Sequence, residues 1–160
     1  MTSDNDTTAA PFVPQDFDVP TALNTPHFRL EPLGPEHNAR DLAAWTGSIA
    51  HIRSSPGWET QTWPPLDGMS AEQNLGDLQE HADDFAQRKG FTYSVIEDPD
   101  EVIGCVYIYP SRDPAHHTAV RSWVRADRAE LDAPLRTAVS AWLSDWPLGS
   151  VNYAPARPSA

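Results

Sequence analysis

The sequence has little that would let it bind polyanions or cross a membrane. Lys89 is the only lysine beside ten arginines, and the 160 residues carry a formal net charge of -12. Because nucleic-acid binding depends on basic side chains that neutralise phosphates, nucleic acid is not an expected partner. No apolar run approaches the roughly 20 residues of a transmembrane helix, and no basic and apolar leader opens the chain. We therefore expect no membrane association and a cytoplasmic location.

Cysteine is also scarce, since Cys105 is the only one and no internal disulfide is possible. It lies in the apolar run 102–109, where a thiol serves as a small buried hydrophobe, whereas a reactive thiolate needs an accessible, electropositive setting. His116 and His117 have no further ligand at a spacing typical of zinc or iron sites, so we expect no metal. A P-loop, a dinucleotide fingerprint and a Ser/His/Asp order are missing too.

The length permits one domain with a hydrophobic core, although sixteen prolines indicate long irregular stretches. Residues 1–25 contain four aspartates and no basic side chain, which predicts a disordered tail. The alternative is that its apolar residues, Phe12, Val13 and Phe17, dock on the domain. We expect a single domain over residues 26–154 and a flexible end over 155–160.

Hydrophobic periodicity predicts the first half of the domain. Residues 27–33 alternate as a half-buried strand does, and Gly34-Pro35 opens a helix that extends to Pro56-Gly57. Four apolar residues recur at helical spacing in that helix: Leu42, Trp45, Ile49 and Ile52. A loop rich in tryptophan and proline follows over 58–69. Ser70 and Gln73 then form a capping box for a second helix, for which Gly90 supplies the stop.

The second half reads as strands followed by a helix. Residues 91–97 and 101–109 are β-rich runs joined by the turn-forming 98–100, which predicts a hairpin. A strand over 118–124 leads to a helix from Asp132 to Pro147, with an apolar stripe that is typical of core. A short strand over 150–154 completes the order β-α-α-β-β-β-α-β. This is an α/β (α+β) chain.

This order, and two segments in particular, resemble the GCN5-related N-acetyltransferase (GNAT) family. The hairpin FTYSVIEDPDEVIGCVYI contains a Val-Ile-Gly phrase at 102–104 after an acidic turn, and FRLEPLGPEH at 28–37 is similar to the family's first strand and helix start. The resemblance covers about residues 27–154. It implies a mixed, mainly antiparallel sheet flanked by helices, with the family's last elements truncated at the C-terminus, and acetyl-CoA as cosubstrate.

In the family, a motif spaced like Gln/Arg-x-x-Gly-x-Gly/Ala cradles the pyrophosphate of acetyl-CoA after the fourth strand. The corresponding segment here is 123–135, and the resemblance implies these cofactor-binding residues: Val124, Arg125, Arg128, Leu131, Asp132 and Ala133. A leucine replaces the first glycine, which we expect to keep phosphate from the backbone, and nearby carboxylates would repel it. The helix N-terminus and two arginines could compensate. Alternatively, those arginines pair with Asp127, Glu130 or Asp132.

Amine acetylation needs a base that accepts a proton from the ammonium. By chain position the candidates are His117, with its neighbour His116, and Glu97; the alternative is that each is a solvated loop residue. The loop 58–65 would lie near the acceptor side of a GNAT-like fold, where it could shape a pocket for an apolar or aromatic amine or simply cap the core. The family's catalytic tyrosine is not carried onto Tyr153.

Two hypotheses follow from the resemblance. The first is an acyl-CoA-dependent N-acyltransferase, in practice an N-acetyltransferase, that acts on a small-molecule or peptide amine. The second is a non-catalytic GNAT-fold module that has lost acetyl-CoA and works in binding or assembly through an exposed sheet edge. An exposed edge would also permit a homodimer.

Overall fold

The computed structural model describes residues 11–153 of the chain. Its elements are, in order, β2 (Leu23–Asn24), β3 (Arg29–Pro32), η1 (Pro35–His37), α2 (Asn38–Thr46), α3 (Ile49–Arg53), α4 (Ala71–Ala86), β4 (Phe91–Glu97), β5 (Glu101–Pro110), β6 (Thr118–Val124), η2 (Ala126–Leu131), α5 (Asp132–Leu143) and β7 (Val151–Tyr153). The predicted order is present. The structure adds one strand, β2, and two short 3-10 helices, η1 and η2, and it divides the first predicted helix. The end predicted to be flexible, 155–160, lies outside the described residues.

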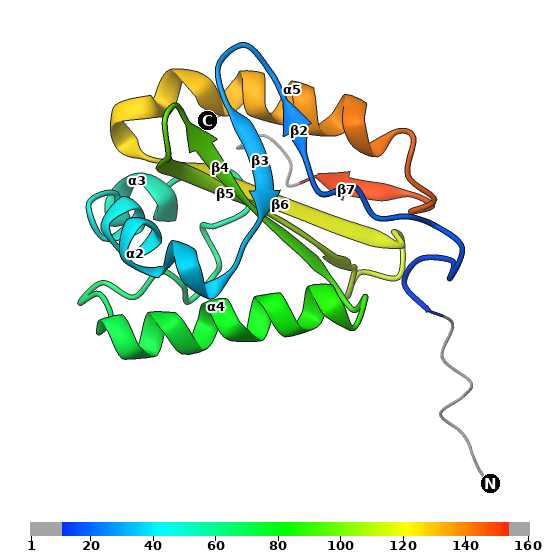
Figure 1. The fold of residues 1–160 in the computed structure, drawn as a ribbon, viewed down its shortest axis with the longest axis horizontal. Coiled ribbons are helices and arrows are strands. Elements are labelled where there is room, and N and C mark those ends of the chain that lie inside the picture. Colours follow the sequence, from blue (N-terminus) through cyan, green and yellow to red (C-terminus); the bar gives the residue numbers. More distant parts are fainter. Residues whose placement is uncertain (1–10, 154–160) are drawn as a thin grey trace, which may run out of the picture.

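The six strands form one sheet in the order β2-β3-β4-β5-β6-β7. Neighbouring strands are antiparallel, apart from β6 and β7, which run parallel. The predicted hairpin is confirmed, since Phe91 pairs with Ile108 and Glu97 with Glu101. Figure 1 shows α5 along one side of the sheet and α2, α3 and α4 on the other. The predicted mixed, mainly antiparallel sheet flanked by helices is confirmed.

Side chains that alternate along the central strands build a separate core on each face of the sheet. Val106 and Ile108 of β5 lie in the cluster that contains Leu135 and Val139 of α5. Cys105, which points to the other face, belongs to the opposite cluster with Trp45 of α2 and Trp123 of β6. Burial raises the pKa of the Cys105 thiol, so the interpretation as a small buried hydrophobe is confirmed.

Helix α4 begins as predicted and ends earlier. The Ser70 hydroxyl accepts from the Gln73 N–H at 3.1 Å and the Gln73 side chain accepts from the Ser70 N–H at 3.0 Å, so the capping box is confirmed. The helix stops at Ala86, not at Gly90, because Arg88 adopts the left-handed conformation with φ 61°. Arg88 donates to the carbonyls of Pro14 and Phe17, which hold the chain in this turn.

The first predicted helix is divided into η1, α2 and α3. The break falls at Gly47 and Ser48, two residue types that favour helix ends. It leaves Ser48 buried and turned toward the loop after β6, where it bonds the N–H of Ala126. The break therefore fixes one of the contacts of the candidate site.

Residues 11–25, predicted to belong to a disordered tail, differ from that prediction in the structure. Val13 is 1% exposed, and the rings of Phe12 and Phe91 stack with centroids 5.8 Å apart. The Tyr93 hydroxyl donates to the Pro20 carbonyl at 2.7 Å. The cause is apolar area, because the few apolar side chains of this segment cover an open end of the α5-side core. The rest of the predicted tail, 1–10, lies outside the described residues.

Candidate functional site

Strand β6 has a strand partner on its β7 side over only its first half. Residues 118–120 pair with 151–153, and in the described part of the chain the pairing ends there. Beyond that point the Ser122 carbonyl accepts a hydrogen bond from the indole Nε1 of Trp58 at 2.9 Å. The hydroxyl groups of Ser122 and Tyr153 share a short hydrogen bond, and burial raises the pKa of Tyr153 to about 12. Side chains thus occupy this edge of β6.

The loop that follows β6 is tied to the rest of the fold through its main chain. The Arg125 N–H donates to the Ile103 carbonyl at 2.8 Å, and the Ala126 N–H donates to the Ser48 hydroxyl at 2.8 Å. Helix α5, twelve residues long, then begins at Asp132 as predicted. The first two N–H groups of the loop consequently have partners within the protein.

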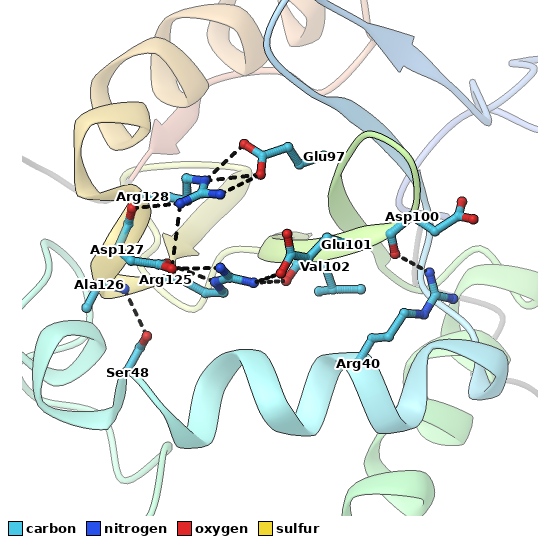
Figure 2. A network of polar contacts seen from close by, with 10 residues as sticks. All are labelled: Arg40, Ser48, Glu97, Asp100, Glu101, Val102, Arg125, Ala126, Asp127 and Arg128. Carbon is cyan, nitrogen blue, oxygen red and sulfur yellow. Dashed lines mark hydrogen bonds and ion pairs between the residues drawn. The ribbon is translucent and has the colours of Figure 1, made fainter.

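Both arginines of this loop are engaged by carboxylates, as Figure 2 shows. Arg125 contacts Asp127 at 2.7 Å and Glu101 at 2.9 Å. Arg128 donates from Nη2 and Nε to Glu97 at 2.7 and 2.9 Å, and lies 3.6 Å from Asp127. The hydrogen bond from Arg128 lowers the pKa of Glu97, and that from Arg125 lowers the pKa of Asp127. Three carboxylates therefore surround two guanidinium groups.

The other residues that the resemblance assigns to the cofactor are dispersed. Val124 and Leu131 are buried in the α5-side core, and Ala133 is exposed. Asp132 is half-buried at the start of α5, where burial raises its pKa. The sequence predicts that Leu131 projects into the space for phosphate, and this prediction is wrong. The side chain is buried in the α5-side core instead, because burial of its apolar area is favourable. The leucine itself does not block the loop.

A cavity of about 410 Å³ separates α2 from this loop and the start of β5. Arg40 lies at its rim and donates to the Asp100 carbonyl at 2.6 Å (Figure 2). A diphosphate needs cationic groups and free N–H donors. The loop offers two guanidinium groups, and phosphate oxygens would have to replace the carboxylates of Glu97, Glu101 and Asp127 to reach both of them.

A larger cavity, of about 1000 Å³, lies on the opposite side of β6 from α5 and is bounded by α4, β5 and the tryptophan-rich loop. Its aromatic wall consists of Trp58, Trp63, Tyr107 and Tyr109. Trp58 touches Tyr107 edge to face with ring centroids 5.5 Å apart, and Trp63 packs against Trp58 at the same distance. Both alternatives for loop 58–65 apply to these two tryptophans, since they line the cavity and also belong to or pack against the core cluster on this face of the sheet. Arg121 of β6 also lines the cavity and donates to the Gly57 carbonyl.

A hydrogen-bonded chain brings one histidine to this cavity. The Tyr109 hydroxyl donates to Asp84 at 2.9 Å, and its oxygen lies 2.9 Å from Nδ1 of His81. The Thr92 hydroxyl oxygen also lies 3.2 Å from Nδ1. Because the tyrosine proton is used for Asp84, we assign the proton of the neutral imidazole to Nδ1, as donor to Tyr109, which leaves Nε2 with a lone pair. Burial lowers the pKa of His81, so the neutral imidazole is favoured near neutral pH.

A buried carboxyl group forms part of the same cavity. Asp41 of α2 is 4% exposed, and its Oδ2 accepts from the Asn74 amide at 3.1 Å. Asn74 is fixed in turn, since its Oδ1 accepts from the indole of Trp45 at 3.0 Å. Burial raises the pKa of Asp41 to about 6. Strongly shifted groups in a cavity are a common mark of functional sites.

The bases predicted from chain position lie apart from this cavity. His117 is exposed at the start of β6, where its Nδ1 accepts from the Ser150 N–H at 3.3 Å and supports the turn into β7. His116 lies 3.4 Å from Asp113. Glu97 is on β4, held by Arg128, and its carboxylate is already hydrogen-bonded. The structure therefore does not bring Glu97 and His117 together.

Neither a metal cluster nor a membrane span is found in the part of the chain that the structure describes. Among residues 11–153, no group of three or more His, Cys, Asp or Glu side chains is arranged to hold a metal ion. No helix in that same range is long and apolar enough to cross a membrane.

Three solved structures are similar to this chain over most of its length. A ribosomal-protein-S5-alanine acetyltransferase from Vibrio fischeri superposes with a TM-score of 0.59 at 14% identity, over 79% of this chain and 66% of that one. A protein described as a GNAT-family acetyltransferase from Bordetella pertussis gives 0.53 at 14%, over 77% and 73%. The microcin C7 self-immunity acetyltransferase MccE, in complex with acetyl-CoA and AMP, gives 0.59 at 8%, over 81% and 68%.

The chain has the GNAT fold. No family model matches the sequence, and no curated protein does either. The chain spans about two thirds of the length of the Vibrio fischeri enzyme. Strand β6 connects these features. Ala119 and Arg121 line the large cavity, the half of β6 after residue 120 has no β7 partner among the described residues, and the loop to α5 follows Val124.

Sequence reasoning missed the residues that build the large cavity. His81 has Asp77 four residues before it and Asp84 three after it, a spacing that places all three on one helix face and could have drawn attention. Asp41 precedes an apolar residue in a predicted helix, with nothing to distinguish it from a solvated acid. Its burial depends on Asn74, 33 residues away, which no local pattern reveals.

Proposed function

We propose that the chain is an acyl-CoA-dependent N-acyltransferase that transfers an acetyl group to a small-molecule or peptide amine. The observation that supports this most directly is the large cavity beside β6 in a GNAT fold, because Arg121, one of its two lining residues from β6, lies in the half of the strand that β7 leaves unpaired within residues 11–153. An acceptor in the cavity and a donor along the strand would meet near Arg121 and Ser122.

On the donor side, the thioester supplies an activated acyl group when it is bound. Arg125 would contact its diphosphate after exchanging Glu101 and Asp127 for phosphate oxygens, and Arg128 after exchanging Glu97. These side chains are between 16 and 60% exposed, so the exchange opens no core. It needs a rearrangement of surface side chains only.

On the acceptor side, His81 is the best-placed base among the groups of the cavity. Its Nε2 carries the lone pair, and the bonds from Nδ1 to Tyr109 and on to Asp84 fix the ring. The lowered pKa of His81 keeps that nitrogen available to take a proton from an ammonium group. Tyr109 and Asp84 act as positioning residues, since they orient the imidazole and stabilise its protonated form.

Calorimetry with acetyl-CoA and a mass-spectrometric assay of acetyl transfer to a panel of amines test the proposal. We expect saturable binding of acetyl-CoA and a product that is heavier by one acetyl group. The His81→Gln variant should bind acetyl-CoA as the parent does and lose most of the turnover, by about 100-fold or more. Failure of both the parent and the variants described in the Discussion to bind acetyl-CoA at millimolar concentration would rule the proposal out.

A second function is favoured by the network in Figure 2, in which the carboxylates outnumber the arginines. In this alternative the loop is a structural clamp, and the chain is a non-catalytic binding or assembly module. The two functions predict opposite results when Glu101 and Asp127 are neutralised. Acetyl-CoA binding should improve in the enzyme, whereas a clamp should only lose stability.

A further inference from the structure

We propose that the large cavity selects an organic amine that carries a second positive charge, with Asp41 as the charge partner of that remote ammonium group. This inference rests on the proposed function for the reacting end of the molecule, while the binding of the cation itself does not depend on acetyl transfer. It concerns residues to which neither the fold nor the sequence pattern assigns a role.

The aromatic wall fits the carbon chain and the charge of such a ligand. Trp58, Trp63 and Tyr107 all line the cavity, and the ring centroid of Trp58 lies 5.5 Å from that of Trp63 and 5.5 Å from that of Tyr107. Alkyl chains bury apolar area against such rings, and an ammonium group is attracted to their π faces. A neutral, purely apolar ligand would gain only the first of these contacts.

The charges around the cavity favour a cation over an anion. Carboxylates come from two helices and a loop, and they outnumber the guanidinium groups: Asp41, Asp77, Glu80 and Asp113 against Arg112 and Arg121. Arg121 is half-buried and hydrogen-bonded to Gly57. The field inside the cavity is therefore negative, and low-dielectric walls strengthen it.

Asp41 is the acid built into the structure, unlike the exposed Glu80. Asn74 holds its Oδ2, and both residues are under 5% exposed. Burial of a carboxyl group without a cation is costly. The raised pKa of Asp41 reports this cost, and an ammonium group in the cavity would remove much of it.

The ligand needs a second amino group because the nitrogen that reacts must be neutral, whereas the nitrogen that binds at Asp41 must be charged. The nitrogen that attacks an acyl group must lose its proton, so the amine that His81 serves is neutral when it reacts. A negative cavity would hinder that loss for a simple monoamine. A second ammonium group, bound at Asp41, lets the same field contribute to affinity while the reacting nitrogen is deprotonated near His81.

The test is calorimetry with putrescine as a diamine probe, in the absence of acetyl-CoA, beside n-butylamine and butanediol as probes with one and no charge. We expect putrescine to bind at least about tenfold more tightly than n-butylamine, and butanediol to show no saturable binding. Asp41→Asn should weaken putrescine binding by about tenfold or more. Glu72→Gln, the same charge change on an exposed part of α4 outside the cavity, should leave it within about twofold.

The pH dependence gives a separate readout. Putrescine affinity should fall as the pH decreases from about 7.5 to about 5.5, because Asp41, with a pKa of about 6, becomes protonated. Asp77, Cys105 and Tyr107 also face Asp41, and the thiol and phenol stay neutral in this window. In the Asp41→Asn variant, putrescine affinity should change with pH by less than half as much as it does in the parent, on a logarithmic scale.

The outcomes separate this inference from the proposed function. Equal affinity for putrescine and butanediol, or no effect of Asp41→Asn, overturns the cation site even if a monoamine is acetylated. Tight, Asp41-dependent putrescine binding supports the site even where acetyl-CoA does not bind and the enzymatic proposal fails.

Discussion

The indole N–H of Trp58 donates to the main-chain carbonyl of Ser122 at 2.9 Å, across 64 residues of sequence. The tryptophan thus joins the irregular loop to the part of β6 that has no strand partner on its β7 side in residues 11–153. Its ring is at the same time a wall of the large cavity. One side chain therefore both satisfies a buried carbonyl group and shapes the site.

Replacing Trp58 by Phe should destabilise the fold more than the same change at Trp63. Both variants lose indole area, but only Trp58→Phe leaves the Ser122 carbonyl without its donor, which costs about 1–3 kcal/mol in addition. Urea denaturation followed by circular dichroism measures the two free energies of unfolding. Equal losses in the two variants would contradict the importance of this hydrogen bond.

Neutralising the carboxylates of the loop should strengthen acetyl-CoA binding. In the Glu101→Gln, Asp127→Asn double variant, Arg125 loses both of its anionic partners, so phosphate oxygens no longer compete with a carboxylate for this guanidinium group. We expect the dissociation constant from calorimetry to fall by about three- to tenfold, a modest factor because these groups are largely exposed. Glu130→Gln is the control, since Glu130 is an exposed acid of the same loop outside the network of Figure 2. A gain as large in that control would point to a general charge effect.

Asp41→Asn should stabilise the protein near neutral pH while it removes the proposed ligand site. The folded-state pKa of Asp41 is about 6, above its ordinary value of 3.8, so the native state binds more protons between these values. Stability is then lost as the pH rises from about 4 to about 6, and the penalty near pH 7 is about 2–3 kcal/mol. The variant should be more stable there by about 1–3 kcal/mol and match the parent near about pH 4. Urea denaturation at several pH values checks this, and a less stable variant at neutral pH would show that Asp41 is a structural anchor.

Two glycines should respond oppositely to alanine. A Cβ at Gly104 would lie 2.3 Å from the carbonyl oxygen of Trp123, a backbone atom that cannot move without disturbing the β5–β6 ladder. Gly104→Ala should lower the free energy of unfolding by about 2–4 kcal/mol. A Cβ at Gly76, on α4, would meet nothing within 4 Å, so Gly76→Ala should stabilise the helix by about 0.5–1 kcal/mol. Thermal denaturation of both variants measures the contrast.

The close approach at Gly104 also shows why part of the fold can be predicted. The Val-Ile-Gly phrase, the acidic turn and the alternation of the hairpin are local signals, and the capping box at Ser70 is another. The break between α2 and α3 has only a weak local signal, Gly47 followed by Ser48, and its contact of Ser48 with the Ala126 N–H spans 78 residues. Composition is likewise misleading for residues 11–25, since a few apolar side chains such as Val13 suffice once a core offers space.

The candidate site is less predictable for the same reason. Pairing of Arg125 with Asp127 is one of the alternatives drawn from the sequence, because the two are near neighbours. The partners Glu97 and Glu101 come from the hairpin, and the cavity with Asp41, Asn74 and His81 exists only when two helices pack on the sheet. Motif spacing locates a loop in the chain, whereas it says nothing of which charges the fold places around it.

The outer strand next to β3, β2, comprises only two residues. So short a strand presents few free N–H and C=O groups to a foreign strand, which is a recognised protection against aggregation through sheet edges. A second copy that approached the sheet from this side would find little backbone to join. Self-association through β2 is therefore not expected to form a continuous intermolecular sheet.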